Sequence, residues 1–131
     1  MEKILTEKIK LIIEGGDGSL MGRVHYDDNL IVDEAKTVEE LERNMKKLLL
    51  DFHDLDETSY EFQIEYDLTA FFEQFDYLKI TKIAELSGLN GSLVRQYATG
   101  KKFPSANQAQ KIEGAVRQIV KQLSDVRIYT H

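Results

Sequence analysis

Residues 79–105 read KITKIAELSGLNGSLVRQYATGKKFPS. Apolar residues recur at helical spacing over residues 80–86, and Gly88 then suits the left-handed backbone conformation that ends many helices. Asn90 is a favourable N-cap for a second helix, which would stop at Gly100. The stretch therefore predicts two short helices joined by a tight turn.

The second predicted helix has an apolar side and a polar side. Its inward side chains are Leu93, Val94 and Tyr97, whereas Gly91, Ser92, Arg95 and Gln96 lie on the outer side. Two short helices at a steep angle form a helix-turn-helix, whose second helix enters the DNA major groove by its N-terminal end. A helical hairpin that does not contact DNA is the alternative interpretation of the same pattern.

The residues that we expect to contact DNA lie in the second helix and just after it. They are Asn90, Gly91, Ser92, Arg95, Gln96, Lys101 and Lys102. Gln96 can pair with adenine, and Arg95 can reach guanine or phosphate. Lys101 and Lys102 should bind phosphate without reading the base sequence.

This stretch resembles the phage-repressor (Xre) family of helix-turn-helix domains. The matching residues are Ile83-Ala84-Glu85, Gly88-Leu89-Asn90, Val94, Gly100-Lys101-Lys102 and Pro104-Ser105. In that family, the first residues of the second helix and one residue a turn later reach base edges. The resemblance implies this role for Gly91, Ser92 and Gln96.

Length and composition limit the class of protein. The chain has 131 residues, of which 42% are hydrophobic, so it can form one domain or two small ones with packed cores. It has no cysteine, which excludes a disulfide framework and a Cys-ligated zinc site and fits a reducing compartment. We find no signal-peptide pattern and no apolar run that could span a bilayer, so we expect a cytoplasmic protein without a membrane partner.

The net charge of −6 is unevenly distributed along the chain. Residues 1–66 contain 8 basic and 17 acidic residues, a net charge of −9, whereas residues 67–131 contain 9 and 6, a net charge of +3. The second half would attract a phosphate backbone, and the first half would suit a basic protein partner. Solubility alone is the simpler explanation of the acidic half. We predict a domain boundary between residues 66 and 67.

The first half has strand character in four segments, which are residues 3–13, 20–26, 30–32 and 60–66. Thr37 and Glu40 form a capping box at the start of a helix that precedes the fourth strand. Its apolar stripe consists of Val38, Leu41, Met45, Leu48, Leu49 and Phe52. The order β-β-β-α-β predicts a small α/β layer in which one helix covers one sheet face, and the whole chain is expected to be α+β.

The glycine-rich residues 15–18, GGDG, lie between the first two predicted strands. A phosphate-binding glycine loop leads from a strand into a helix, whereas this one leads into another strand. We therefore predict a hairpin turn and no nucleotide site.

The first half resembles the HicB-type antitoxin domain over about residues 3–66. The matching residues are Lys10-Leu11-Ile12-Ile13-Glu14, the Asp17-Gly18 turn, Thr37-Val38-Glu39-Glu40-Leu41 and Asn44-Met45. The resemblance implies a partial RNase-H-like layer without nuclease activity. It also implies that the chain neutralises a small basic RNase toxin of the HicA type and represses the antitoxin–toxin operon.

The rest of the second half is predicted to be helical. Asp67 caps a helix whose inner face holds Leu68, Phe71, Phe72 and Phe75. Ser105 and Gln108 cap a last helix that runs to about Ser124, with an apolar stripe of Ala109, Ile112, Val116, Ile119, Val120 and Leu123. Part of this stripe could pair with a second copy, so a homodimer or a higher homo-oligomer is expected. Residues 126–129 read as a strand or a dimer contact.

We expect no catalytic residue, cofactor or metal. Asp51, Asp54, Asp56 and Glu57 cluster in a predicted exposed loop rather than in a cleft. His25, His53 and His131 are far apart in the sequence and lie near no nucleophile. The leading hypothesis, which the two resemblances and the charge split together imply, is a non-enzymatic antitoxin and transcription repressor. A transcriptional regulator whose first domain has a regulatory or dimerisation role is the alternative, and a binding-only scaffold is the third.

Overall fold

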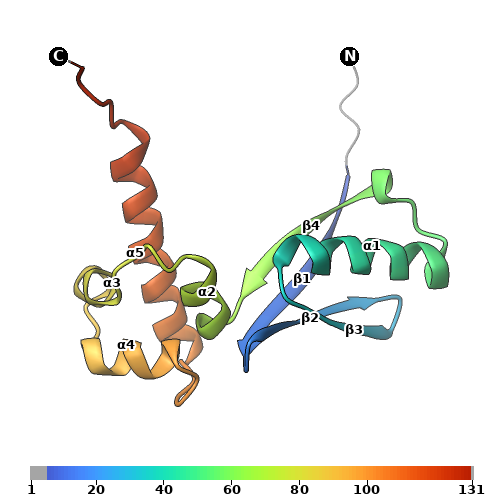
Figure 1. Cartoon of the computed structure of the whole chain (residues 1–131), viewed down its shortest axis with the longest axis horizontal. Coiled ribbons are helices and arrows are strands. Elements are labelled where there is room, and N and C mark those ends of the chain that lie inside the picture. Colours follow the sequence, from blue (N-terminus) through green and yellow to red (C-terminus); the bar gives the residue numbers. More distant parts are fainter. Residues whose placement is uncertain (1–5, 131) are drawn as a thin grey trace. The chain divides into compact units, whose positions relative to one another are not determined.

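The computed structural model describes residues 6–130, so residues 3–5 of the first predicted strand and His131 lie outside the described range. Within it the chain is α+β, with one four-stranded mixed sheet and five α-helices (Figure 1). The strands are β1 (Glu7–Gly16), β2 (Ser19–Tyr26), β3 (Asn29–Ala35) and β4 (Tyr60–Tyr66). The helices are α1 (Val38–His53), α2 (Leu68–Gln74), α3 (Ile80–Ser87), α4 (Gly91–Ala98) and α5 (Ala106–Ser124).

The chain divides into two compact units between Glu73 and Gln74. The boundary that we predicted after residue 66 lies before α2, whereas this division leaves nearly all of α2 with the sheet. In the sequence, the first unit contains 8 basic and 19 acidic residues, which gives a net charge of −11. The second unit contains 9 basic and 4 acidic residues, which gives a net charge of +5. The contrast in charge is therefore sharper between these units than between the predicted halves.

The sheet of the first unit has the order β3-β2-β1-β4. β1 and β2 pair antiparallel, as do β2 and β3, and their turns place Asp17, Asp27 and Asp28 at positive φ. β4 pairs parallel with β1, so the chain must cross over from β3, and α1 lies in this crossover. The glycine-rich residues 15–18 do lead from one strand into the next.

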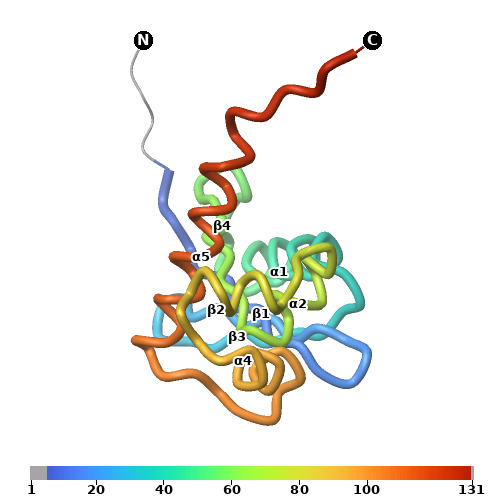
Figure 2. The backbone as a smooth tube through the Cα atoms, turned by 90° about the vertical axis from the view of Figure 1, so that its left-hand side faces the viewer, coloured from blue at the N-terminus to red at the C-terminus, as the bar shows by residue number. Residues whose placement is uncertain are grey.

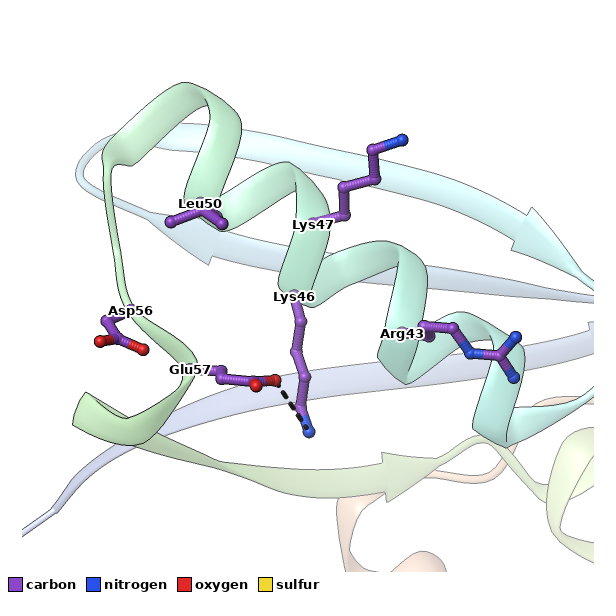
Figure 3. Close-up of a pocket in the computed structure, with 6 residues that line it drawn as sticks. All are labelled: Arg43, Lys46, Lys47, Leu50, Asp56 and Glu57. Carbon is purple, nitrogen blue, oxygen red and sulfur yellow. Dashed lines mark ion pairs between the residues drawn. The ribbon is translucent and has the colours of Figure 1, made fainter.

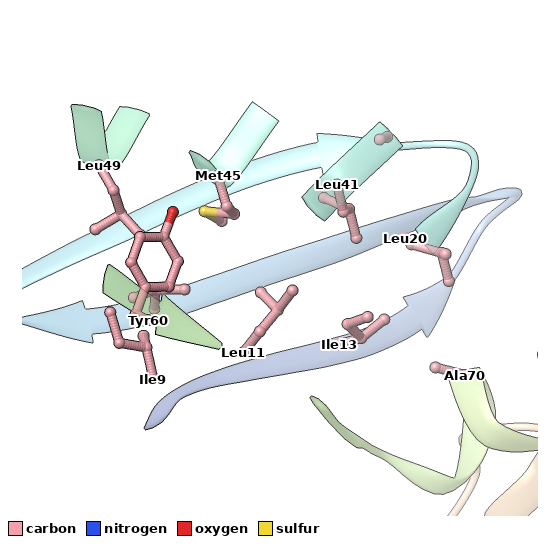
Figure 4. Packing of buried hydrophobic residues seen from close by; sticks show 11 residues of the cluster. Ile9, Leu11, Ile13, Leu20, Leu41, Met45, Leu49, Tyr60 and Ala70 are labelled. Carbon is pink, nitrogen blue, oxygen red and sulfur yellow. The ribbon is translucent and has the colours of Figure 1, made fainter. Parts of the chain in front are cut away.

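The core of the first unit lies between α1 and one face of the sheet (Figure 4). Leu41, Met45 and Leu49 of α1 are fully buried there. Gly22 allows this close approach, because a Cβ atom at that position would lie 3.0 Å from Leu41 Cδ2. The prediction for Phe52 was wrong: its side chain is 75% exposed, because it lies in the last turn of α1, beyond Leu49, the last fully buried residue of that helix.

α2 follows β4 directly and begins against β1. Asp67 Oδ1 accepts hydrogen bonds from the Ala70 amide at 2.8 Å, which confirms the predicted cap, and from the Gly15 amide at 3.1 Å. The predicted inner face of this helix is confirmed only in part. Phe72 is buried, but Leu68 and Phe71 are only partly buried, and Phe75 lies beyond the helix end. The reason is that the small Ala70 is the side chain that packs into the core, at a point where a Cβ on Gly15 would lie 2.7 Å from the Ala70 amide nitrogen.

The second unit packs α3 against both α4 and α5. Its buried side chains are Ile83, Ala84, Val94, Tyr97, Ile112 and Ala115. Ser105 Oγ accepts from the Gln108 amide at 3.2 Å, which confirms the cap of α5. The last turns of α5 extend away from α3 and α4 (Figure 2), so much of its predicted apolar stripe stays outside the core, and residues 126–129 form no strand. In the part of the chain that the structure describes, no helix combines the length and apolar character that a membrane span needs.

Candidate nucleic-acid interface

The turn between α3 and α4 contains the left-handed glycine that the sequence predicts. Gly88 has φ 73° and ψ 16°, and its amide reaches the carbonyl oxygens of Ala84 and Glu85. The Leu89 amide also donates to the Ala84 carbonyl at 3.1 Å. These bonds satisfy the free carbonyls at the end of α3 and confirm the predicted helix end.

α4 begins at the predicted cap. The Asn90 side-chain oxygen accepts a hydrogen bond from the Ser92 amide at 2.8 Å. The asparagine-glycine pair is therefore a helix start and not a hairpin turn. Because the amide side chain of Asn90 is used in this bond, its availability for a DNA base is reduced.

The inward side of α4 packs against the rest of its unit. Val94 is fully buried and Tyr97 nearly so, while Leu93 is partly buried. The Tyr97 hydroxyl donates to Gln108 Oε1 of α5. Since one side of α4 is held in this way, the opposite side, with Ser92 and Arg95, is turned to solvent.

The loop after α4 is tied back to the same helix. Gly100 has φ 79°, and the amides of Lys101 and Lys102 both donate to the Gln96 carbonyl, at 2.9 Å and 3.2 Å. The two lysine side chains are exposed. The backbone thus sets where the two cations stand relative to the outer side of α4.

The seven predicted DNA contacts lie in one continuous segment. Asn90, Ser92, Arg95, Lys101 and Lys102 are exposed, whereas Gly91 and Gln96 are partly buried. Within residues 6–130, Arg95, Lys101 and Lys102 have no carboxylate within ion-pair distance, whereas Lys82 pairs with Glu85 and Arg117 with Glu113. The segment therefore offers three exposed cations without a carboxylate partner among the described residues, in a unit whose sequence has a net charge of +5.

Sequence reasoning left Phe103 without a role. Its side chain is 79% exposed and directly follows Lys101 and Lys102. An exposed aromatic ring beside two cations suits contact with sugars or bases as well as with phosphate. The signal in the sequence was the placement of a phenylalanine in an otherwise polar, basic connection.

The acidic residues just after α1, Asp54, Asp56 and Glu57, do not form a comparable site. Asp54 is the C-cap of α1, and Asp56 accepts from the Thr58 amide at 3.2 Å. Asp56 and Glu57 also line a surface pocket of about 310 Å³ with Arg43, Lys46, Lys47 and Leu50 (Figure 3). Lys46 Nζ lies 3.9 Å from Glu57 Oε2, so the charges there partly compensate each other.

Two further observations concern metal and ligand binding. Over residues 6–130, no group of three or more His, Asp or Glu side chains is placed to hold a metal ion. The pocket of Figure 3 has one apolar side chain among five charged ones, whereas small-molecule sites are lined mostly by apolar groups. The segment around α4 is therefore the strongest candidate site.

The chain matches no family model, and no curated protein or solved structure is significantly similar to it.

Proposed function

We propose that this protein is a cytoplasmic antitoxin that binds a small basic RNase toxin and represses its own operon by binding operator DNA. The observation that carries the proposal is the arrangement around α4. Arg95 on this helix and Lys101 and Lys102 in the loop after it are exposed, and none of the three forms an ion pair with another residue of the range 6–130. An outer helix face with free cations beside it can place side chains in the major groove while the lysines bind phosphate.

The DNA-binding role divides among the residues of the segment. Ser92 and Arg95 are the best placed to reach base edges, because both are exposed at the outer side of α4. Gln96 is partly buried and would reach a base only with its amide end. Lys101 and Lys102 supply the contribution that is independent of base sequence and depends on salt.

The toxin-binding role belongs to the first unit. Three features support it: the net charge of −11, the resemblance to the HicB-type domain, and a sheet in which one helix covers one face. A basic RNase would be attracted by such a surface, and complementary charge speeds the encounter. The net charges of the two units, −11 and +5, support the binding of protein and DNA partners to different parts of the chain.

The test uses the full-length chain together with the small basic reading frame beside its gene. That frame should stop growth when expressed alone, and the full chain should restore growth. The double variant Lys101→Ala, Lys102→Ala should still restore growth but should no longer repress a reporter placed behind the operon promoter. This separation would assign the two roles to two surfaces.

Two results would contradict the proposal. If no neighbouring frame is toxic while the reporter is still repressed, the chain is a transcriptional regulator without a toxin partner. If purified protein shows no salt-dependent binding to the promoter DNA, the repressor role fails, and rescue of growth would then leave an antitoxin alone.

A further inference from the structure

The strand β3 lies at the edge of the sheet opposite β4 and, among the described residues, pairs only with β2 (Figure 1). An edge strand presents a row of backbone N–H and C=O groups that no neighbouring strand uses, and natural proteins protect such an edge with lysine, proline or a very short strand. β3 is seven residues long, and its sequence NLIVDEA contains neither lysine nor proline. Its edge is therefore open to a further strand.

Two apolar side chains of β3 are exposed beside this open edge. Leu30 and Val32 are 54% and 49% exposed, and Met21 on the neighbouring strand is 40% exposed. Val24 is paired with Ile31 and belongs to the core under α1, so Leu30 and Val32 lie on the opposite face of the sheet. On β1 and β4, by contrast, the described residues include no exposed large apolar side chain. The exposed apolar surface of the sheet therefore lies at its β3 side.

The charges of the sheet also differ between its two sides. The cations on β1 and β2 are used in ion pairs within the sheet, which are Lys8–Glu61 at 3.1 Å, Lys10–Glu65 at 3.2 Å and Arg23–Glu14 at 2.7 Å. Residues 27–35, which are β3 and the turn before it, contain four carboxylates and no cation: Asp27, Asp28, Asp33 and Glu34. None of the four forms an ion pair with another residue of the range 6–130. Glu34 accepts a hydrogen bond from the Ser19 hydroxyl at 2.6 Å, which leaves its charge in place.

We propose that the β3 edge, made of residues 27–35, binds a β-strand of a basic protein partner by adding it to the sheet. The backbone of the added strand would pair with β3, its apolar side chains would pack on Leu30 and Val32, and its cations would meet the four carboxylates. The inference rests on the proposed function, because it locates the surface of the first unit that would hold the basic protein partner.

Charge favours a basic partner over a second copy of the chain. Two copies joined through β3 would bring the four carboxylates of each edge together, and like charges opposite one another destabilise a strand pair. The edge at β4 is a poorer candidate for the same partner, because Glu61 and Glu65 already pair with lysines of β1. Complementary charge in an exposed interface is screened by salt, so binding at β3 should weaken as the ionic strength rises.

The test measures the affinity of the full chain for the protein encoded by the small basic reading frame beside its gene, by isothermal titration calorimetry. Val32→Lys should raise the dissociation constant at least about tenfold, because it removes an apolar contact and places a cation on the edge. The matched control is Gln63→Lys, since Gln63 is exposed on β4, at the other edge of the sheet. It adds the same charge outside the proposed surface and should leave the dissociation constant nearly unchanged.

Amide hydrogen exchange distinguishes strand addition from a contact that involves side chains alone. When the partner binds, the amides of residues 29–35 should exchange more slowly, because those that face away from β2 gain hydrogen bonds. The amides of β4 should exchange as they do in the free chain. Circular dichroism and the melting temperature would verify that each variant is folded.

Two results would overturn the inference alone: a Val32→Lys variant that binds the partner as the wild type does, or a wild-type complex in which exchange at residues 29–35 is unchanged. A basic protein that does not bind the chain at all would overturn both the inference and the antitoxin role. A basic protein that binds at β3 without stopping growth would support the inference and contradict the antitoxin role.

Discussion

The backbone amide of Lys101 donates a hydrogen bond to the carbonyl oxygen of Gln96 over 2.9 Å. A residue expected to bind phosphate is thereby tied to a residue on the helix expected to read bases. The bond belongs to the backbone, so it persists when either side chain is replaced. The roles of the two side chains can consequently be separated by mutation without moving the loop.

Replacing side chains on the outer side of α4 should reduce discrimination between DNA sequences. For Arg95→Ala with Gln96→Ala, we expect a loss of about 1–3 kcal/mol in the preference for operator over random DNA, because base-edge contacts are removed. Lys101→Ala should instead weaken binding to all sequences and lower the salt slope by about 1. Fluorescence anisotropy at several salt concentrations measures both quantities.

The control for these variants is Lys111→Ala, since Lys111 is exposed on α5 outside the predicted interface. It should change neither the preference nor the slope appreciably. Unchanged discrimination in Arg95→Ala with Gln96→Ala would remove α4 from the reading role.

Asn90 has a structural role that can be separated from a DNA contact. Asn90→Ala should lower the free energy of unfolding by about 1 kcal/mol, because the Ser92 amide loses its acceptor. Asn90→Ser keeps a capping oxygen and should retain most of the stability. Urea denaturation measures the stability, and DNA binding of Asn90→Ser shows whether the amide itself contacts DNA. A stable Asn90→Ala variant would contradict the capping role.

Two glycines form a matched pair for backbone conformation. A Cβ atom would meet nothing within 4 Å at either Gly88 or Gly114, but Gly88 has φ 73° whereas Gly114 lies inside α5. Gly88→Ala should destabilise the second unit by about 1–2 kcal/mol because of the left-handed backbone. Gly114→Ala should stabilise it by about 0.5–1 kcal/mol because alanine favours helix. Thermal denaturation of the two variants should therefore show shifts of opposite sign, and shifts of the same sign would refute the argument.

Tyr60 should limit stability at high pH. Burial, followed by the nearby carboxylates of Glu57 and Asp56, raises the pKa of its hydroxyl above the ordinary value of 10.0. A pKa that is higher in the folded chain stabilises the fold below the unfolded pKa, and this contribution is lost as the pH rises through the folded pKa. We expect the free energy of unfolding to fall above about pH 10, and to fall less steeply in Tyr60→Phe.

The same substitution should also matter at neutral pH. The Tyr60 hydroxyl is buried and has no hydrogen-bond partner among residues 6–130. Tyr60→Phe should therefore raise the free energy of unfolding by about 1 kcal/mol, since an unsatisfied buried hydroxyl is removed. Urea denaturation near neutral pH tests this, and a clear loss of stability would mean that the hydroxyl does have a partner.

The sequence alone predicted the helix caps and helix ends in which a side chain or a glycine interacts with backbone atoms only a few residues away. Thr37, Asn90 and Ser105 each accept the predicted capping bond, and Gly88 ends α3 in the left-handed conformation. These features depend on atoms a few residues apart. The sequence pattern contains all the information that they need.

Burial was less predictable because it depends on what lies opposite. Phe52 continues the stripe of α1 in the sequence, but the side chain is exposed beyond the last buried residue of the helix. Ala70 is completely buried although larger apolar residues surround it in the sequence, because β1 approaches it closely at Gly15. Likewise, the exposure of the apolar side chains at the end of α5 is apparent only when the positions of α3 and α4 are known.

By itself, the sequence determined the secondary-structure elements, their order, their caps and the separation of acidic and basic parts. Only the tertiary structure decided that β4 pairs parallel with β1, that Asp67 binds the Gly15 amide, and that the amides of Lys101 and Lys102 share one carbonyl of α4. Helix caps and hydrophobic periodicity depend on residues that are close together in the sequence. Strand pairing and burial depend on interactions between segments that are distant in the sequence, so they are decided only when the whole unit is assembled.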